Sequence, residues 1–310
     1  MTTAIFISLL TSAIRLATPL LLAALAGVYS ERSGVVNIAL EGIMTSGAFF
    51  SIWFTHVTGS AWLGVLMGVV FGIITSSILA LIAVNLKGNQ VIAGTAINLL
   101  VMAVVAFLLE IIWHRSGSTP TAPSMLTTNP LRFLEGIPLL GTFFSQLTPF
   151  VYIAFIMVGL TYFVLWKTPW GLHVRAVGEH PRAADTVGIN VYRTRWICVL
   201  ISGALAGLAG ATLSVGTVGL FREGMVAGKG FIALAALVFG KWHPVKTMFA
   251  CLFFGLCSAV NILAQSFGVN VPNEFLAMIP YVATILVLIG VVGKAQAPKA
   301  DGEPYEKDEK

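Results

Sequence analysis

Nine long apolar runs, separated by short polar or glycine-rich stretches, constrain this chain more than any other feature of its sequence. Most runs approach or exceed the roughly 20 residues that an α-helix needs to cross a hydrocarbon core about 30 Å thick. They are continuous and do not alternate between apolar and polar residues, which favours helices over the strands of a membrane barrel. The runs cover residues 5–29, 35–57, 60–86, 90–113, 149–166, 196–219, 225–240, 247–266 and 275–293.

Composition agrees with a membrane environment. Hydrophobic residues make up 57% of the chain and charged residues only 10%, whereas soluble proteins carry about 25% charged residues. We therefore predict an all-α polytopic membrane protein with about nine transmembrane helices. Because the run 225–240 is short enough to cross only halfway, eight to ten crossings are compatible with the sequence. Residues 1–293 form the predicted membrane domain, and residues 294–310 form a solvated, disordered tail.

Basic residues set the expected orientation. If the N-terminus lies outside, most Lys and Arg residues fall in the segments predicted to face the cytoplasm, chiefly residues 167–195 and the tail. This agrees with the positive-inside rule and places the C-terminus in the cytoplasm. The longest loop, residues 114–148, is then extracellular. The positive net charge is explained by topology, so we expect contact with membrane lipid and none with nucleic acid.

Motifs for chemistry within the chain are missing from the sequence. Neither Gly228-Lys229-Gly230 nor Gly240-Lys241-Trp242 continues into the Ser or Thr of a phosphate-binding loop. The three cysteines lie in apolar runs and suggest neither disulfides nor a metal centre. We therefore expect no enzymatic activity and no bound cofactor or metal in this chain.

The predicted cytoplasmic loop, residues 167–195, contains a short helix that begins at Pro181 and ends at Gly188. Proline suits the first turn of a helix, and glycine ends helices in the left-handed conformation. A short exposed helix of this kind can dock into a partner's groove and transmit movement, although an ordinary basic loop is the alternative. The residues predicted to couple to a partner are Pro181, Arg182, Ala183, Ala184, Asp185 and Gly188.

Three stretches carry a family resemblance. YSERSGVVNIALEGIMTSGA (29–48), the run from Leu172 to Gly210 and GKGFIALAALVFGKWHP (228–244) resemble the permease subunits of bacterial ABC importers for nucleosides and related simple sugars. These subunits belong with the ribose and branched-chain amino acid permeases. The first stretch is most similar to the shorter of two paired permeases in nucleoside systems.

The resemblance implies a subunit of the bacterial cytoplasmic membrane without ATPase activity of its own. Its implied partners are a second, related permease, a cytoplasmic ATPase that uses ATP and Mg²⁺, and an extracellular substrate-binding lipoprotein. The spacing of Ala183, Ala184 and Gly188 is similar to the ATPase-contacting loop of such importers. Arg182 stands where that loop has a Glu, so the individual contacts do not carry over.

A row of polar residues marks the expected substrate path. Read as one helix, the run 35–57 aligns Asn37, Glu41 and Thr45 on one face and carries Glu41 about 13–14 Å inward from Arg32. An acidic side chain at such a depth costs about 2.5–3.5 kcal/mol on insertion scales, so it needs a polar partner or a wet cavity. The predicted substrate-path residues are Asn37, Glu41, Thr45, Asn98, Phe231 and Asn261.

Three roles remain open for Glu41. It either braces helices through an interhelical hydrogen bond or a pair with Arg15, lines the substrate path, or relays protons. The echo between IALEGI (38–43) and IALAAL (232–237) also hints at two related halves, as in many transporters.

The sequence therefore predicts a permease subunit of an ATP-driven importer that translocates nucleosides or a related simple sugar. A proton-coupled secondary transporter of a small polar solute is the alternative, and a non-transporting scaffold agrees less well with polar groups at this depth.

Overall fold

The structure, a computed structural model, describes residues 2–127, 143, 144, 146–266, 278, 282 and 296–307. Its elements are helices, which are α1 (Thr2–Arg32), α2 (Leu40–Thr58), α3 (Ala61–Ala80), α4 (Gln90–Trp113), α6 (Pro149–Lys167), α7 (Pro169–Glu179), α8 (Pro181–Thr186), α9 (Val191–Leu213), α10 (Lys229–Phe239) and α11 (Pro244–Ser266). Two π-helical turns, Leu81–Asn85 and Ser214–Val218, extend α3 and α9. No strand occurs in the described part, which agrees with the predicted all-α class.

Six described helices are long and apolar enough to span a membrane, namely α1, α3, α4, α6, α9 and α11. Helix α2 has 19 residues, most of them buried. Helix α10 has only 11 residues. The predicted run 275–293 lies outside the described residues, so the expected nine crossings remain a prediction.

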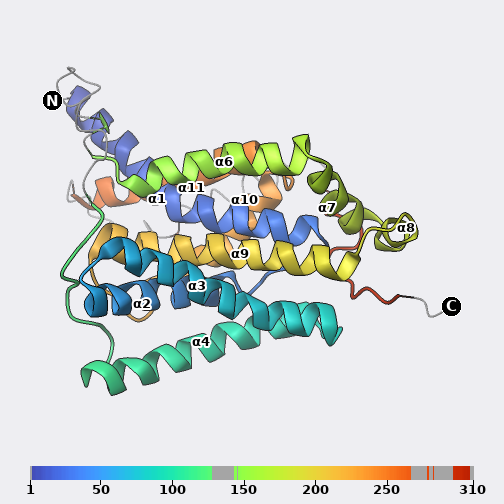
Figure 1. Ribbon diagram of the computed structural model, residues 1–310. Helices are drawn as coiled ribbons and strands as arrows, with labels where there is room; N and C mark the ends of the chain where they lie inside the picture. Colours follow the sequence, from blue (N-terminus) through green and yellow to red (C-terminus); the bar gives the residue numbers. More distant parts are fainter. Residues whose placement is uncertain are drawn as a thin grey trace.

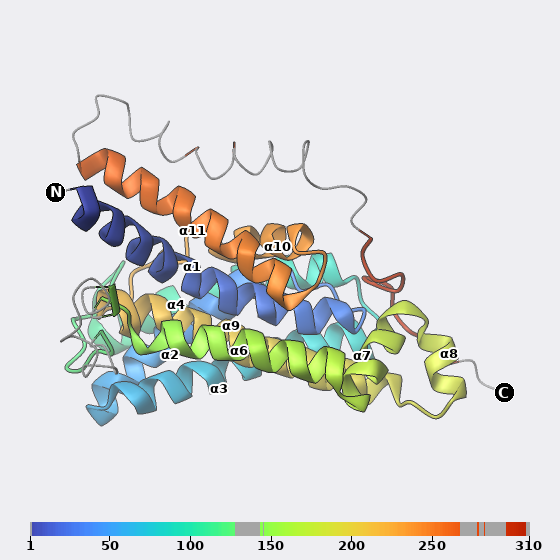
Figure 2. The same ribbon diagram turned by 90° about the horizontal axis from the view of Figure 1, so that it is seen from above.

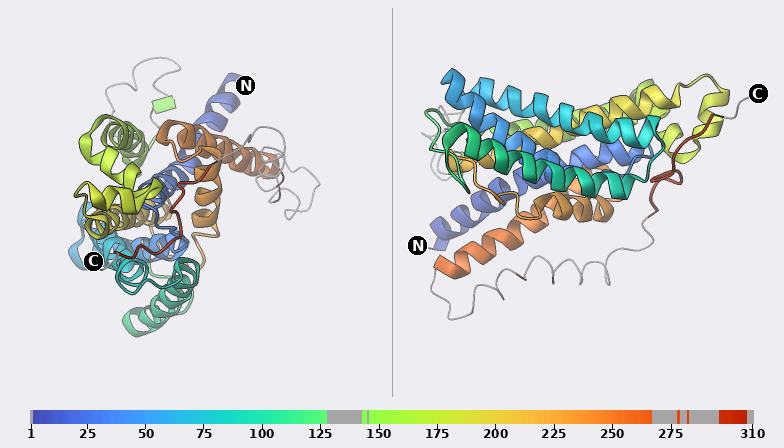
Figure 3. Two further views of the ribbon diagram at one scale, coloured as in Figure 1. Left: turned by 90° about the vertical axis from the view of Figure 1, so that its right-hand side faces the viewer. Right: turned by 90° about the horizontal axis from the view of Figure 1, so that it is seen from below.

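The long helices run side by side, with α1 and α9 in the middle of the bundle and the two chain ends at opposite ends of it (Figure 1). Helix α9 packs against α1, α2 and α3, while α11 lies along α1 (Figure 2). Helix α4 packs against α2 at the edge of the bundle, seen end-on in Figure 3. Helices α7 and α8 project from the end at which the C-terminus lies; we call it the α8 end.

Glycines bring α3 and α9 into backbone contact. A Cβ added to Gly72 would lie 2.4 Å from the carbonyl oxygen of Gly203, and one added to Gly207 would lie 2.5 Å from that of Gly68. Small residues at such crossings let helices approach closely in a membrane, where packing takes over the role of the hydrophobic effect. The close crossing holds α9 at the centre of the bundle.

Two expectations from the sequence are wrong in detail. The run 35–57 is helical only from Leu40, because Gly34 takes a left-handed conformation at φ 88° and the chain stays irregular up to Ala39. The tail, predicted to be disordered, packs onto the α8 end over residues 296–307, where Ala300 and Tyr305 are buried. Composition alone misses this packing because these two small contacts sit among many charged residues.

Candidate functional site

Glu41 lies where two helices begin. It belongs to the first turn of α2, and its carboxylate accepts hydrogen bonds from the backbone N–H groups of Gly228 (2.7 Å) and Gly230 (2.8 Å). These groups open α10, whose first N–H groups have no partner within their own helix. Helix N-termini favour negative charge, so the carboxylate is stabilised by the starts of both helices.

This arrangement gives Glu41 an interhelical hydrogen bond, one of the alternatives considered from the sequence. Its partner is the α10 backbone; within the described part of the chain, no ion pair joins Glu41 to Arg15. Gly230 is required at this contact, since an added Cβ would lie 2.6 Å from the backbone nitrogen of Glu41. Glu41 as a whole is half-buried.

The irregular segment 33–39 is held by side chains of α4. Gln90 accepts a hydrogen bond from the backbone N–H of Val36 at 2.7 Å, and Asn98 donates one to the carbonyl oxygen of Ile38 at 3.0 Å. Irregular backbone is tolerated at membrane depth only where protein or water satisfies its polar groups. The sequence can therefore leave the helix here because α4 supplies the partners.

Asn98 also caps α2. Its side-chain oxygen accepts a hydrogen bond from the backbone N–H of Gly42 at 2.7 Å, and Ala39, at the N-cap, makes no side-chain cap of its own. Asn98 is only 8% exposed. A residue of another helix thus fulfils the role that a local Ser or Asp usually has.

Asn37 is fully buried in the irregular segment. Its amide donates a hydrogen bond to the hydroxyl of Ser202 on α9 at 2.9 Å, while its side-chain oxygen has no partner. Buried acceptors are rarely left unpaired, and this oxygen is one of the exceptions among the described residues. We call the group of Asn37, Glu41, Asn98, Ser202, Gly228 and Gly230 the helix-end site.

The predicted row of polar residues on one helical face does not form. Asn37 precedes α2, so it does not share a helical face with Glu41; only Thr45 follows at helical spacing, and its hydroxyl bonds the Glu41 carbonyl oxygen at 2.8 Å. The other two predicted residues are Phe231, which directly follows Gly230, and Asn261. Phe231 is 49% exposed on α10, and Asn261 on α11 accepts a hydrogen bond from Gln265 of the same helix.

Sequence reasoning did not single out Ser202, Gln90, Gly228 or Gly230 for the site. The signal for the glycines was present in Gly228-Lys229-Gly230, which stands directly before an apolar run. In the sequence the tripeptide resembles an incomplete phosphate loop, whereas in the structure its backbone N–H groups form the start of α10 and bind Glu41. Ser202 and Gln90 carry no local signal, because their partners are remote in sequence. Among the described residues, no three His, Cys, Asp or Glu side chains gather as metal ligands.

The predicted coupling residues lie together at the α8 end. Helix α8 spans Pro181–Thr186, and Gly188 follows in the left-handed conformation at φ 88°, as the sequence predicts. Ala184 is buried against the rest of the protein, whereas Arg182, Ala183 and Gly188 are exposed. The helix therefore packs on the protein through Ala184 and exposes its opposite side.

Comparison of the sequence with known proteins shows the family of this chain. The family model described as branched-chain amino acid transport system / permease component matches residues 9–291. The guanosine ABC transporter permease protein NupQ of Bacillus subtilis (strain 168) is 44% identical over 301 residues, covering 94% of both chains. The nucleoside ABC transporter permease protein NupC of Lactococcus lactis subsp. cremoris (strain MG1363) is 42% identical over 94% of both chains.

A second Bacillus subtilis protein, the guanosine ABC transporter permease protein NupP, is 28% identical over 93% of this chain and 84% of its own length. Two permease proteins named for the same substrate thus resemble this chain to different degrees. Six apolar helices and these relatives together indicate a multi-pass protein of the cytoplasmic membrane. The chain belongs to the family of branched-chain amino acid transport system permease components.

Proposed function

We propose that this chain is the permease subunit of an ATP-driven importer that carries nucleosides across the cytoplasmic membrane. The observation that carries the proposal is the 44% identity to a guanosine permease over 94% of both chains. The structure supports it with a polar site built from two helix starts inside an apolar bundle. A proton-coupled secondary transporter lacks comparable support from the relatives.

The proposed substrate path runs along the helix-end site. A nucleoside offers ribose hydroxyls and base N–H groups, which are hydrogen-bond donors. The unpaired side-chain oxygen of Asn37 and the remaining lone pairs of Glu41 are acceptors suited to them. Transporter sites commonly form where helices are interrupted, and segment 33–39 is such an interruption. Thr45, Phe231 and Asn261 stay predicted members of the path.

The proposed topology has nine crossings, an external N-terminus and a cytoplasmic α8 end. Placement of the two chain ends at opposite ends of the bundle supports an odd number of crossings. In this orientation α8 docks onto a cytoplasmic ATPase, which hydrolyses ATP with Mg²⁺. A second permease completes the pathway, and an extracellular lipoprotein delivers substrate. The occurrence of two related permeases in Bacillus subtilis supports a heterodimer.

An uptake assay tests the function. The complete transporter is expressed in a strain that lacks nucleoside uptake, and entry of radiolabelled guanosine is measured with and without this chain. We expect uptake that depends on the chain, stops when ATP is depleted and survives an uncoupler of the proton gradient. Uptake that collapses with the uncoupler but ignores ATP depletion would favour the secondary transporter instead.

The docking role of α8 has its own test. Gly188 has φ 88° and its N–H bonds the Asp185 carbonyl oxygen at 3.0 Å, whereas proline fixes φ near −65° and has no N–H. Gly188→Pro should therefore release the ATPase or uncouple it. The matched control is Gly224→Pro, in the loop before α10, also at a positive φ of 72°. Equal co-purification of the ATPase and equal ATP turnover in both variants would contradict docking at α8.

A further inference from the structure

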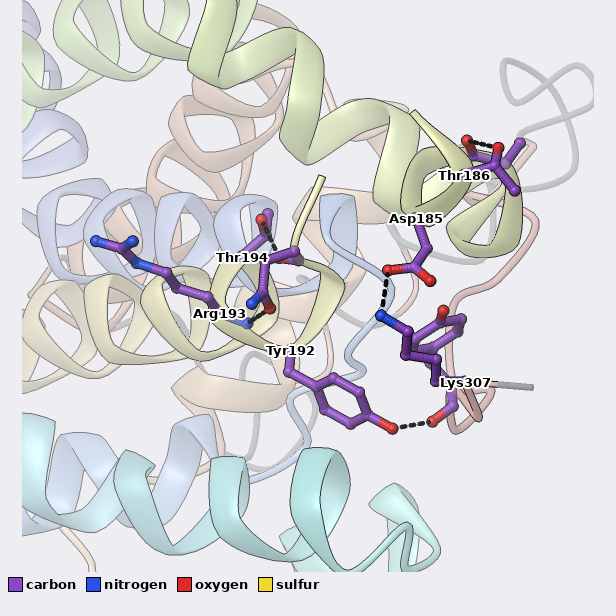
Figure 4. A network of polar contacts seen from close by, with 9 residues as sticks. Asp185, Thr186, Tyr192, Arg193, Thr194 and Lys307 are labelled. Carbon is purple, nitrogen blue, oxygen red and sulfur yellow. Dashed lines mark hydrogen bonds and ion pairs between the residues drawn. The ribbon is translucent and has the colours of Figure 1, made fainter. Parts of the chain in front are cut away.

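Residues 296–307 cross the α8 end of the bundle as an irregular segment with a turn at 299–302, and we call this segment the C-terminal strap. The backbone N–H of Ala300 donates a hydrogen bond to the carbonyl oxygen of Gly178 in α7 at 2.9 Å. Lys307 pairs with Asp185 of α8 at 3.5 Å, as Figure 4 shows. Glu306 pairs with Lys87, in the turn before α4, at 3.1 Å. The strap thus contacts several elements that otherwise lie apart.

Tyr305 anchors the strap beneath α8. Its side chain is 6% exposed and joins a small apolar cluster with Val177 of α7, Ala184 of α8 and Val191 of α9. The hydroxyl of Tyr192 donates a hydrogen bond to the Tyr305 carbonyl oxygen at 3.3 Å, and the two rings lie 5.5 Å apart. Ala184 is the one buried residue of α8. Because a six-residue helix cannot bury a core of its own, this cluster fixes where α8 sits.

Arg195 of α9 provides the second anchor. It is 1% exposed and is the largest fully buried side chain among the described residues. Its Nη1 donates to the carbonyl oxygen of Glu303 at 2.9 Å, and its Nε donates to the carbonyl oxygen of Ser33 at 3.1 Å. Gly34 packs on the same guanidinium, since a Cβ there would lie 2.8 Å from Nη2.

The hydrogen bonds of a buried guanidinium are costly to break. Taking such a charge out of water is costly, and breaking its bonds leaves it uncompensated. Arg195 therefore moves together with the two backbones it holds. One backbone belongs to the strap, and the other begins the irregular segment 33–39, which carries Asn37 of the helix-end site.

We propose that the C-terminal strap is part of the coupling device and that Tyr305 and Arg195 are its positioning residues. Displacement of α8 passes through Tyr305 to the strap, through Arg195 to Ser33 and so to the segment that carries Asn37. The proposal rests on the proposed function, because α8 must receive its movement from the ATPase. It adds a route to the helix-end site that passes through Arg195 near the start of α9.

The experiment uses the complete transporter reconstituted in liposomes and guanosine as the transported probe. The variants are Tyr305→Ala, Tyr305→Phe and Arg195→Lys, with Lys299→Ala, an exposed strap residue, as the matched control. Three quantities are measured for each variant: ATPase co-purification, ATP hydrolysis, and guanosine taken up per ATP hydrolysed. The last quantity reports coupling, because a purely structural role lowers the amount of assembled transporter but leaves this ratio unchanged.

We expect Tyr305→Ala and Arg195→Lys to keep the ATPase bound and hydrolysing ATP while uptake per ATP falls about 5-fold or more. Tyr305→Phe keeps the buried ring and should retain more of this uptake than Tyr305→Ala. Uptake per ATP equal to that of Lys299→Ala in both impaired variants would overturn the proposal, as would failure of both to assemble. If the unmodified chain binds no ATPase or carries no guanosine, the proposed function itself fails.

Discussion

Replacement of Glu41 by glutamine tests the helix-end site most directly. The carboxylate accepts two backbone hydrogen bonds, at 2.7 and 2.8 Å, and bonds to a charged group are each worth about 1.5–3 kcal/mol. Glutamine keeps one acceptor oxygen but loses the charge, and its NH₂ group faces the second N–H donor. One bond weakens to a neutral one of about 0.5–1.5 kcal/mol, and one donor is left unpaired at a cost of about 1–3 kcal/mol.

We therefore expect Glu41→Gln to lower the free energy of unfolding by about 3 kcal/mol, measured by denaturant unfolding of the purified protein in detergent. Glu110→Gln is the matched control, because Glu110 is an exposed residue near the end of α4. Surface substitutions of this kind usually change stability by less than about 0.5 kcal/mol.

Guanosine uptake by Glu41→Gln distinguishes a structural role of Glu41 from contact between Glu41 and substrate. A purely structural role lowers the amount of active transporter and leaves the KM for uptake unchanged, whereas contact with substrate raises KM as well. Equal unfolding curves for Glu41→Gln and Glu110→Gln would refute the inference that Glu41 stabilises the start of α10. Unchanged uptake kinetics in Glu41→Gln would remove that carboxylate from the substrate path.

Three further predictions follow from contacts elsewhere. Asn98→Ala removes the hydrogen-bond partner of the buried Gly42 N–H and of the part-buried Ile38 carbonyl. It should cost about 2–4 kcal/mol in the same unfolding assay, compared with exposed Thr95→Ala. A difference below about 0.5 kcal/mol would contradict the capping role. Gly207→Leu should prevent the α3–α9 crossing, since even a Cβ would meet the Gly68 carbonyl oxygen at 2.5 Å. Size-exclusion chromatography should then show loss of the monodisperse peak. Gly159→Leu should retain that peak, because nothing lies near its added Cβ. Burial raises the pKa of Asp301 to about 7 against the opposing effect of Arg195, so the docked strap binds the proton more tightly than the free strap. Docking should then weaken as pH rises from about 4 through about 7. Hydrogen-exchange protection of residues 296–307, taken relative to the intrinsic exchange rate at each pH, should be lower at pH 8 than at pH 6. Asp301→Asn should reduce this difference, and equal protection at both pH values in the unmodified chain would contradict this burial.

The sequence by itself determined the class of the protein and much of its outline. Long apolar runs require backbone hydrogen bonds that only helices satisfy in lipid, so the all-helical class followed from composition and run length. The run 90–113 coincides with α4 because Asn89 caps its start and no proline interrupts it. Gly188 was predictable for a similar reason, since helix endings of this kind depend on local backbone preference.

Tertiary structure decided what Glu41 contacts. Its partners lie 187 and 189 residues away, and no local preference encodes that distance. The same holds for segment 33–39. Its sequence spacing predicts a helix from residue 35, but its backbone is irregular because the side chains of Gln90 and Asn98 satisfy its hydrogen bonds. The strap was hidden for a different reason: its many charges suggest a solvated tail, while its position depends on a few contacts of Tyr305 and Arg195. Local chemistry fixed the helices, and contacts between residues remote in sequence fixed the site.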